Sequence, residues 1–153
     1  MEAENQVWKR EHVFIGQHFD RKEDCLRFIA AKAVELGLCN DAEVTYEGFL
    51  FRESQGPTGL EDGFAIPHTR CNAVVRSGVI LVKTEEPVEW ESMDDNPVQV
   101  MIALIVPNQD GNNEHIRLLA SLSRMLIKKD FRESLKASGS EEEIFHILSE
   151  VMN

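Results

Sequence analysis

The sequence has few of the features that mark several large classes of protein. Its three cysteines, Cys25, Cys39 and Cys71, form no Cys-x-x-Cys pair, so neither a disulfide framework nor a zinc knuckle is predicted and a reducing cytosol is the expected compartment. No apolar run reaches the roughly 18 residues that a membrane-spanning helix needs, and the first ten residues lack the apolar centre of a secretory signal. We therefore expect a soluble, cytoplasmic protein without direct membrane insertion.

Basic residues are also scarce. The chain has 16 lysines and arginines against 27 aspartates and glutamates, which gives a formal net charge of -11. Nucleic acids and anionic membranes attract clustered positive charge, so neither is an expected partner, whereas a basic protein is. The sequence also contains no Gly-x-Ser-x-Gly and no Gly-Lys-Ser/Thr phosphate loop, which disfavours hydrolases and nucleotide-binding enzymes built on these motifs.

The chain does have the length and composition of one folded domain. Its 153 residues, 42% of them hydrophobic, can bury a core without disulfides or metal, so we expect a single domain over residues 1–153. Short apolar runs predict strands near 13–15, 63–66, 77–83 and 98–106, and the last of these is apolar enough to be buried on both faces. Helical spacing predicts helices over about 21–36, 41–53 and 114–126, with two more starting near 130 and 140. This order predicts an α/β fold, a mixed β-sheet with helices packed on it.

Three polar residues mark predicted helix starts. Asp20 with Glu23, and Ser140 with Glu143, fit the capping box, and Asp41 fits a simple N-cap. The second helix has an irregular apolar stripe that includes Val44, Phe49, Leu50 and Phe51. Residues 85–95 contain six acids and no base, so we expect a solvated connection, and they lack the alternating ligands and central glycine of a calcium loop.

The segment from Pro57 to His68 is the most unusual stretch. It contains two glycines and two prolines, which restrict the backbone to a specific path, and it ends in a short buried strand followed by Pro67 and His68. A histidine at a strand end is favourably placed for function. Arg52 precedes it by 16 residues near a predicted helix end, and His115 lies in the first turn of a later helix. These three side chains form the candidate site.

Two chemical interpretations of these residues remain open. A neutral imidazole can attack a phosphoryl group, whose oxygens an arginine and a second imidazole can bind. Alternatively, His68 is a core histidine and Arg52 a solvated cation at a helix C-terminus. A metal site formed by His68, Asp62 and His115 is a weaker third possibility, because the spacing is not the compact one typical of zinc.

The combined pattern resembles a known family. Arg52-Glu53, then Pro57-Thr58-Gly59-Leu60, then Gly63-Phe64-Ala65-Ile66-Pro67-His68 is similar to the signature of enzyme IIA domains of the fructose/mannitol class in the bacterial phosphoenolpyruvate-dependent sugar phosphotransferase system. The similarity extends to residues 94–97, to His115 at the start of a leucine-rich helix and to the acidic last helix, so it covers nearly the whole chain. It implies a mixed sheet flanked by helices on both faces.

The resemblance also implies roles for individual residues. His68 matches the histidine that accepts phosphate from the phosphocarrier protein HPr and passes it to the cysteine of a IIB component, while Arg52 and His115 match the residues that assist it. Thr58, Gly59, Gly63 and Phe64 match the loop at the binding surface, with Phe64 or its neighbours as expected partner contacts.

The resemblance implies neither a cofactor nor a metal. Glu61 stands where many relatives have glycine, which affects the loop rather than the phosphorylated residue. Sugar transport and a regulatory role like that of nitrogen-type IIA proteins both fit, and a IIA domain does not touch the sugar.

Overall fold

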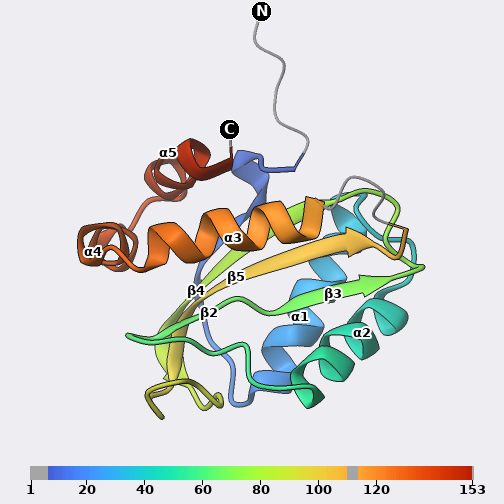
Figure 1. Cartoon of the computed structure of the whole chain (residues 1–153), viewed down its shortest axis with the longest axis horizontal. Coiled ribbons are helices and arrows are strands. Elements are labelled where there is room, and N and C mark those ends of the chain that lie inside the picture. The colour runs from blue at the N-terminus through green and yellow to red at the C-terminus, as the bar shows by residue number, and fades with distance from the viewer. Residues whose placement is uncertain (1–6, 110–113, 153) are drawn as a thin grey trace, which may run out of the picture.

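A computed structural model of the chain describes residues 7–109 and 114–152, excluding the side chains of Glu114 and His115. The polypeptide forms one sheet with helices on either side (Figure 1). The helices are η1 (Arg10–His12), α1 (Lys22–Glu35), α2 (Ala42–Ser54), α3 (Glu114–Leu126), α4 (Lys129–Ala137) and α5 (Glu141–Met152). The strands are β1 (Val13–Gln17), β2 (Phe64–Ala65), β3 (His68–Cys71), β4 (Gly78–Val88) and β5 (Val98–Pro107).

The sheet is mixed, and β5 lies inside it as predicted. The strand order is β1-β4-β5-β2, and β3 also pairs with β5. Strands β1 and β4 are parallel, β4 and β5 are antiparallel, and β2 and β3 run parallel to β5 one after the other. Phe64 pairs with Val100 and His68 pairs with Leu104. The chain therefore leaves the sheet only at Ile66 and Pro67 and then re-enters it along the same edge.

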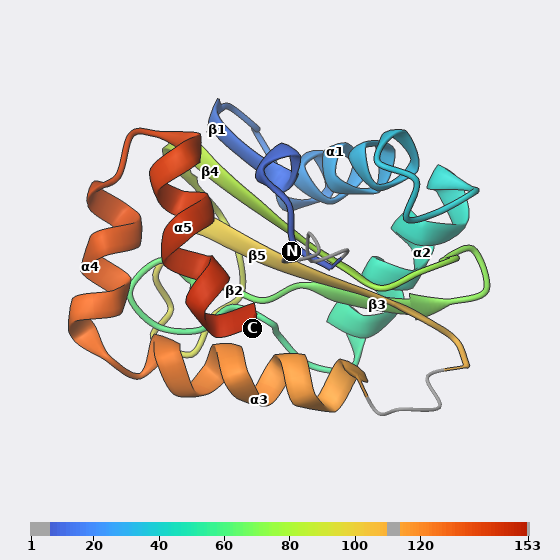
Figure 2. The ribbon, with the colours of Figure 1, turned by 90° about the horizontal axis from the view of Figure 1, so that it is seen from above.

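Alternation of side chains along the strands supplies two cores. Ile80, Val82, Met101 and Ala103 point to the face covered by α1 and α2, whereas Val79, Leu81, Val100 and Ile102 point to the face covered by α3, α4 and α5. Figures 1 and 2 show these two helix layers on opposite sides of the sheet. Burial on both sides explains why β5 is almost continuously apolar.

Several local predictions are confirmed. Asp41 caps α2, because its carboxylate accepts a hydrogen bond from the Val44 backbone N–H at 3.0 Å. The leucine-rich helix predicted over 114–126 is also observed, with Leu118, Leu122 and Leu126 buried. Ser140 caps α5 by accepting from the Glu143 N–H, although the Glu143 carboxylate returns to Ser138 rather than to Ser140. The capping box at Ser140 is therefore only half formed.

Other local predictions are wrong. The residue before α1 is Arg21, which makes no side-chain capping bond, and Asp20 pairs with His18 instead. In α2, Val44 and Phe51 are exposed, by 39% and 68%, because the buried face runs through Thr45, Tyr46, Phe49 and Glu53.

The 85–95 segment is only partly solvated. Strand β4 extends to Val88, and Val88 and Trp90 are buried. Among the described residues no helix is long and apolar enough to cross a membrane.

Candidate functional site

His68 is the first residue of β3, at the open edge of the sheet. The sequence predicts a histidine that follows the end of a strand. In the structure His68 pairs with Leu104 in the middle of β5, so it lies partway along the edge of the sheet. The preceding Pro67 carries no N–H but accepts a bond from the Leu104 N–H at 2.9 Å, which returns the chain to the sheet. The His68 residue is 7% exposed. Its environment is therefore almost fully assembled by the protein.

The hydrogen bonds of His68 define its tautomer. Arg52 Nε lies 2.9 Å from His68 Nε2, and a guanidinium can only donate, so Nε2 must accept with its lone pair. The proton of the neutral ring then lies on Nδ1, which donates to the Ile66 carbonyl at 2.8 Å. A fixed Nδ1–H and an unprotonated Nε2 are the arrangement that a nucleophilic imidazole requires. The nucleophilic lone pair is thus assigned to Nε2.

Arg52 reaches His68 from the last turn of α2. Its Nη1 also donates to the Gly56 carbonyl at 2.8 Å, and the chain turns away at Gly56, whose φ is +146°. Helix α2 ends at Ser54, which confirms the predicted stop before Gly56-Pro57. A single guanidinium therefore holds both the end of its own helix and the imidazole 16 residues later.

Glu53 and Thr58 support the loop from behind. The Thr58 hydroxyl donates to Glu53 Oε2, and the Thr58 carbonyl accepts from the Ile66 N–H at 3.0 Å. Ile66 is the same residue whose carbonyl holds His68 Nδ1. Burial raises the pKa of Glu53, against the opposing effects of Thr58 and of Lys22, whose Nζ lies 3.9 Å from Glu53 Oε1. Thr58 thus ties the loop both to α2 and to the residue that holds the His68 ring.

The glycines of the loop have structural roles. A Cβ on Gly59 would overlap the backbone of Glu91 and Ser92, because the loop pairs with Ser92, in the middle of the β4–β5 connection. Gly63 has φ of +85°, a conformation that disfavours any other residue. Thr58 is 4% and Phe64 0% exposed. The Phe64 side chain packs inside the core, so of the expected contacts, Phe64 or its neighbours, only the neighbours can face a partner.

Sequence reasoning missed an ionic network on the other side of the loop. Asp62, with φ of +63°, pairs with Arg132 Nε at 2.9 Å and with Lys136 Nζ at 2.5 Å, so its pKa is lowered. The hydrogen bond from Lys136 lowers the Asp62 pKa most, and the hydrogen bond from Arg132 lowers it further. The Asp62 N–H donates to Asp94, which lowers the Asp94 pKa to about 2. Because the Asp62 carboxylate is already paired with Arg132 and Lys136, it does not act as a metal ligand together with His68.

His115 is the second residue of α3, and the position of its side chain lies outside the described residues. Among the side chains that are described, no group of three or more His, Cys, Asp or Glu could hold a metal ion. The structure thus brings Arg52 to His68 directly, and Thr58 anchors the loop to α2 through Glu53.

Comparisons with known proteins identify the family of the chain. The family model described as "Phosphoenolpyruvate-dependent sugar phosphotransferase system, EIIA 2" matches residues 6–151. A "PTS system fructose-specific EIIA component" from Haloferax volcanii is 31% identical over 131 residues, which span 86% of this chain and 84% of that protein.

Two solved structures share the fold. Nitrogen regulatory protein IIA-Ntr from Neisseria meningitidis superposes with a TM-score of 0.81 and 28% identity, covering 94% of this chain and 97% of that one. One chain in the structure of the IIAMTL–phosphorylated IIBMTL complex from Escherichia coli matches with a TM-score of 0.77 and 26% identity, covering 92% of this chain and 95% of that one. The predicted mixed sheet flanked by helices is confirmed.

Proposed function

We propose that this chain, which belongs to the EIIA 2 family of the phosphoenolpyruvate-dependent sugar phosphotransferase system, carries a phosphoryl group on Nε2 of His68. The observation that carries the proposal is the pair of hydrogen bonds at the ring, with Arg52 donating to Nε2 at 2.9 Å and Nδ1 facing the Ile66 carbonyl at 2.8 Å. Together they present the Nε2 lone pair at the open edge of the sheet beside a permanent cation.

The transfer step follows from this arrangement. The Nε2 lone pair attacks the phosphorus of a phosphohistidine donor, the donor's P–N bond breaks, and its electron pair returns to the donor ring. The proton on Nδ1 stays bonded to the Ile66 carbonyl, which stabilises the cationic phosphohistidine ring that forms. Arg52 moves its N–H groups from Nε2 to the oxygens of the transferred group. Because phosphoryl transfer depends mainly on positioning and charge stabilisation, these contacts account for the chemistry.

The proposed route runs from an HPr-type phosphocarrier to His68 and then to the cysteine of a IIB component during sugar uptake. The fructose-specific relative and the IIA–IIB complex from E. coli support this route. His115 is proposed as the second histidine that stabilises the phosphoryl group, on its match to the family pattern. Thr58, Gly59 and Gly63 hold the loop that presents His68, rather than contacting the phosphate themselves.

A regulatory role is the second candidate function. The Neisseria structure with a TM-score of 0.81 is a nitrogen regulatory protein. In a regulatory role of this chain, phosphorylation of His68 would set which of two partner-binding states the protein occupies. The site chemistry is identical in both routes. They differ in whether the phosphoryl group must leave His68 for a IIB cysteine, so a transfer assay to IIB separates them.

The test is phosphate incorporation from labelled phosphoenolpyruvate in the presence of enzyme I and HPr. The wild-type chain is expected to gain an acid-labile label that His68→Ala abolishes, while His146→Ala, which changes an exposed histidine on α5, keeps it. Labelling of His68→Ala at the wild-type level, or no labelling of folded wild-type protein by any HPr-type donor, contradicts the proposal. Passage of the label to a IIB protein then supports transport over regulation.

A further inference from the structure

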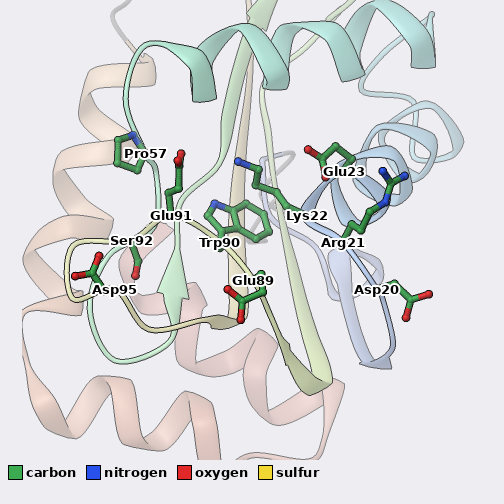
Figure 3. A pocket seen from close by; sticks show the side chains of 10 residues that line it. All are labelled: Asp20, Arg21, Lys22, Glu23, Pro57, Glu89, Trp90, Glu91, Ser92 and Asp95. Atoms are coloured by element: carbon green, nitrogen blue, oxygen red, sulfur yellow. The ribbon is translucent and has the colours of Figure 1, made fainter.

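A large cavity lies beside the loop that carries His68, but not at His68 itself. It has a volume of about 850 Å³ and opens between the first turn of α1 and the segment that follows β4. Figure 3 shows its lining side chains, with Lys22 extending from α1 toward Trp90, and Pro57 on the opposite wall. Neither Arg52 nor His68 lines it. The cavity is therefore separate from the proposed phosphorylation site.

One buried hydrogen-bond donor at this cavity, the Trp90 indole N–H, lacks an acceptor among the described residues. Trp90 is 5% exposed, and its buried indole Nε1–H has no hydrogen-bond partner in the part of the chain that the structure describes. Such a donor is costly to bury, and native proteins rarely leave one unpaired. The Lys22 side chain is only 18% exposed, and its ion-pair partner, Glu53 Oε1, is 3.9 Å away, too far for a hydrogen bond. Helix α1 also begins without a side-chain cap.

The rim of the cavity has the opposite character. Four exposed acids line it, Asp20, Glu89, Glu91 and Asp95, against one exposed cation, Arg21. The entrance is therefore acidic on balance, while the inner wall offers donors. A simple anion would meet repulsion at the rim, and a simple cation would leave the indole N–H without an acceptor. A ligand that carries a negative group at one end and a positive group at the other satisfies both walls.

We propose that this cavity binds a small zwitterion of the α-amino acid type. Its carboxylate accepts hydrogen bonds from the Lys22 ammonium and the Trp90 indole N–H, and its ammonium group faces Glu89 and Glu91. The cavity has room for an amino acid side chain against the Trp90 ring and Pro57. Binding at this position does not require phosphoryl transfer at His68, so the two proposals stand or fall separately.

The two tryptophans of the chain provide a matched test. Trp8 lies in the other core, where its Nε1 donates to the Phe145 carbonyl at 3.0 Å. The twenty proteinogenic amino acids are titrated singly into the wild-type protein by calorimetry, each with its N-acetyl and its amide derivative, which lack the ammonium and the carboxylate respectively. We expect at least one free amino acid to bind with a dissociation constant of about 1 mM or tighter, and both derivatives to bind at least about tenfold more weakly.

Variants locate the ligand. Lys22→Gln and Glu91→Gln are expected to weaken binding at least about tenfold, whereas Lys129→Gln and Glu133→Gln, which change an exposed ion pair on α4, leave it unchanged. Trp8→Phe should retain a saturable change in the emission of Trp90, and Trp90→Phe should lose it, with thermal melts confirming that each variant is folded. The proposal is overturned if no amino acid binds, if the N-acetyl form binds equally well, or if Lys22→Gln has no effect.

Discussion

Gly48→Ala tests how closely α2 must approach the strand that carries His68. Gly48 lies in the middle of α2, where alanine normally stabilises a helix by about 1 kcal/mol relative to glycine. Here a Cβ would overlap Thr69 Oγ1 and would lie 3.4 Å from Thr69 Cβ and 3.7 Å from Cys71 Cβ. Thr69 is 1% exposed, and its hydroxyl is 3.4 Å from the Thr45 carbonyl that accepts its bond. The buried hydroxyl has little room to turn away.

The expected magnitude follows from these opposing effects. Overpacking of a close-packed site costs typically about 1–3 kcal/mol, which exceeds the gain in helix propensity, so the free energy of unfolding should fall by about 1–2 kcal/mol. Arg52 lies one helical turn after Gly48, so moving α2 away from β3 also lengthens the 2.9 Å contact between Arg52 and His68. Phosphoryl transfer should therefore slow along with the loss of stability.

Urea unfolding of four proteins measures the effect: the wild type, Gly48→Ala, Thr69→Ala and the double variant. Thr69→Ala removes the overlapping hydroxyl, so it should cost clearly less stability in the presence of Gly48→Ala than alone, with a coupling energy of about 1 kcal/mol or more. An increase of about 1 kcal/mol in the stability of Gly48→Ala, as helix propensity alone predicts, would refute the close approach.

Three further predictions address the site and the cores. Arg52→Lys keeps the charge but loses the guanidinium fork that contacts His68 and Gly56 together, so the initial rate of phosphate incorporation should fall by about tenfold to a thousandfold with little change in melting temperature; an unchanged rate contradicts this role. Burial raises the pKa of Glu53 above its ordinary 4.5, so near that pH the folded chain binds more protons than the unfolded chain. The free energy of unfolding should therefore fall as the pH rises from about 4.5 through the folded pKa. In urea titrations across this range Glu53→Gln should lack this fall, and pH profiles parallel to those of the wild type would contradict the prediction. Burial raises the thiol pKa of Cys25 to about 12 and of Cys39 to about 11, so iodoacetamide should label the half-buried Cys71 first in the native protein, as mass spectrometry of the digests would show, and faster labelling of Cys25 would contradict the packing.

The elements that sequence reasoning predicted best are those with one dominant local signal. The apolar run of β5 has a single physical explanation, burial on both faces of a sheet, and Asp41 meets the requirements of an N-cap without a competitor. The sequence also placed Arg52 in a candidate site with His68, because the glycine-rich segment between them can fold back, and the two side chains are 2.9 Å apart.

The predictions that failed depend on contacts between distant segments. Trp90 stands among six acids, so the local pattern indicates solvent, but the indole ring is buried in the core formed with α1 and α2. Asp20 fits a capping box and pairs with His18 instead, which shows that a local motif competes with neighbouring charges. The pairing of Asp62 with Arg132 and Lys136 joins residues 70 and 74 positions apart, and no sequence spacing reports such a contact.

The most direct test of the account is the position of phosphorus on the His68 ring. The chain, labelled with ¹⁵N in histidine, is phosphorylated from phosphoenolpyruvate with enzyme I and HPr, and the ³¹P–¹⁵N coupling is recorded by NMR together with the ring protons. The geometry predicts one phosphohistidine, at His68, with phosphorus bonded to Nε2 and the proton retained on Nδ1. Phosphorus on Nδ1, or on any other histidine, would contradict the assignment of Nε2 as the nucleophile.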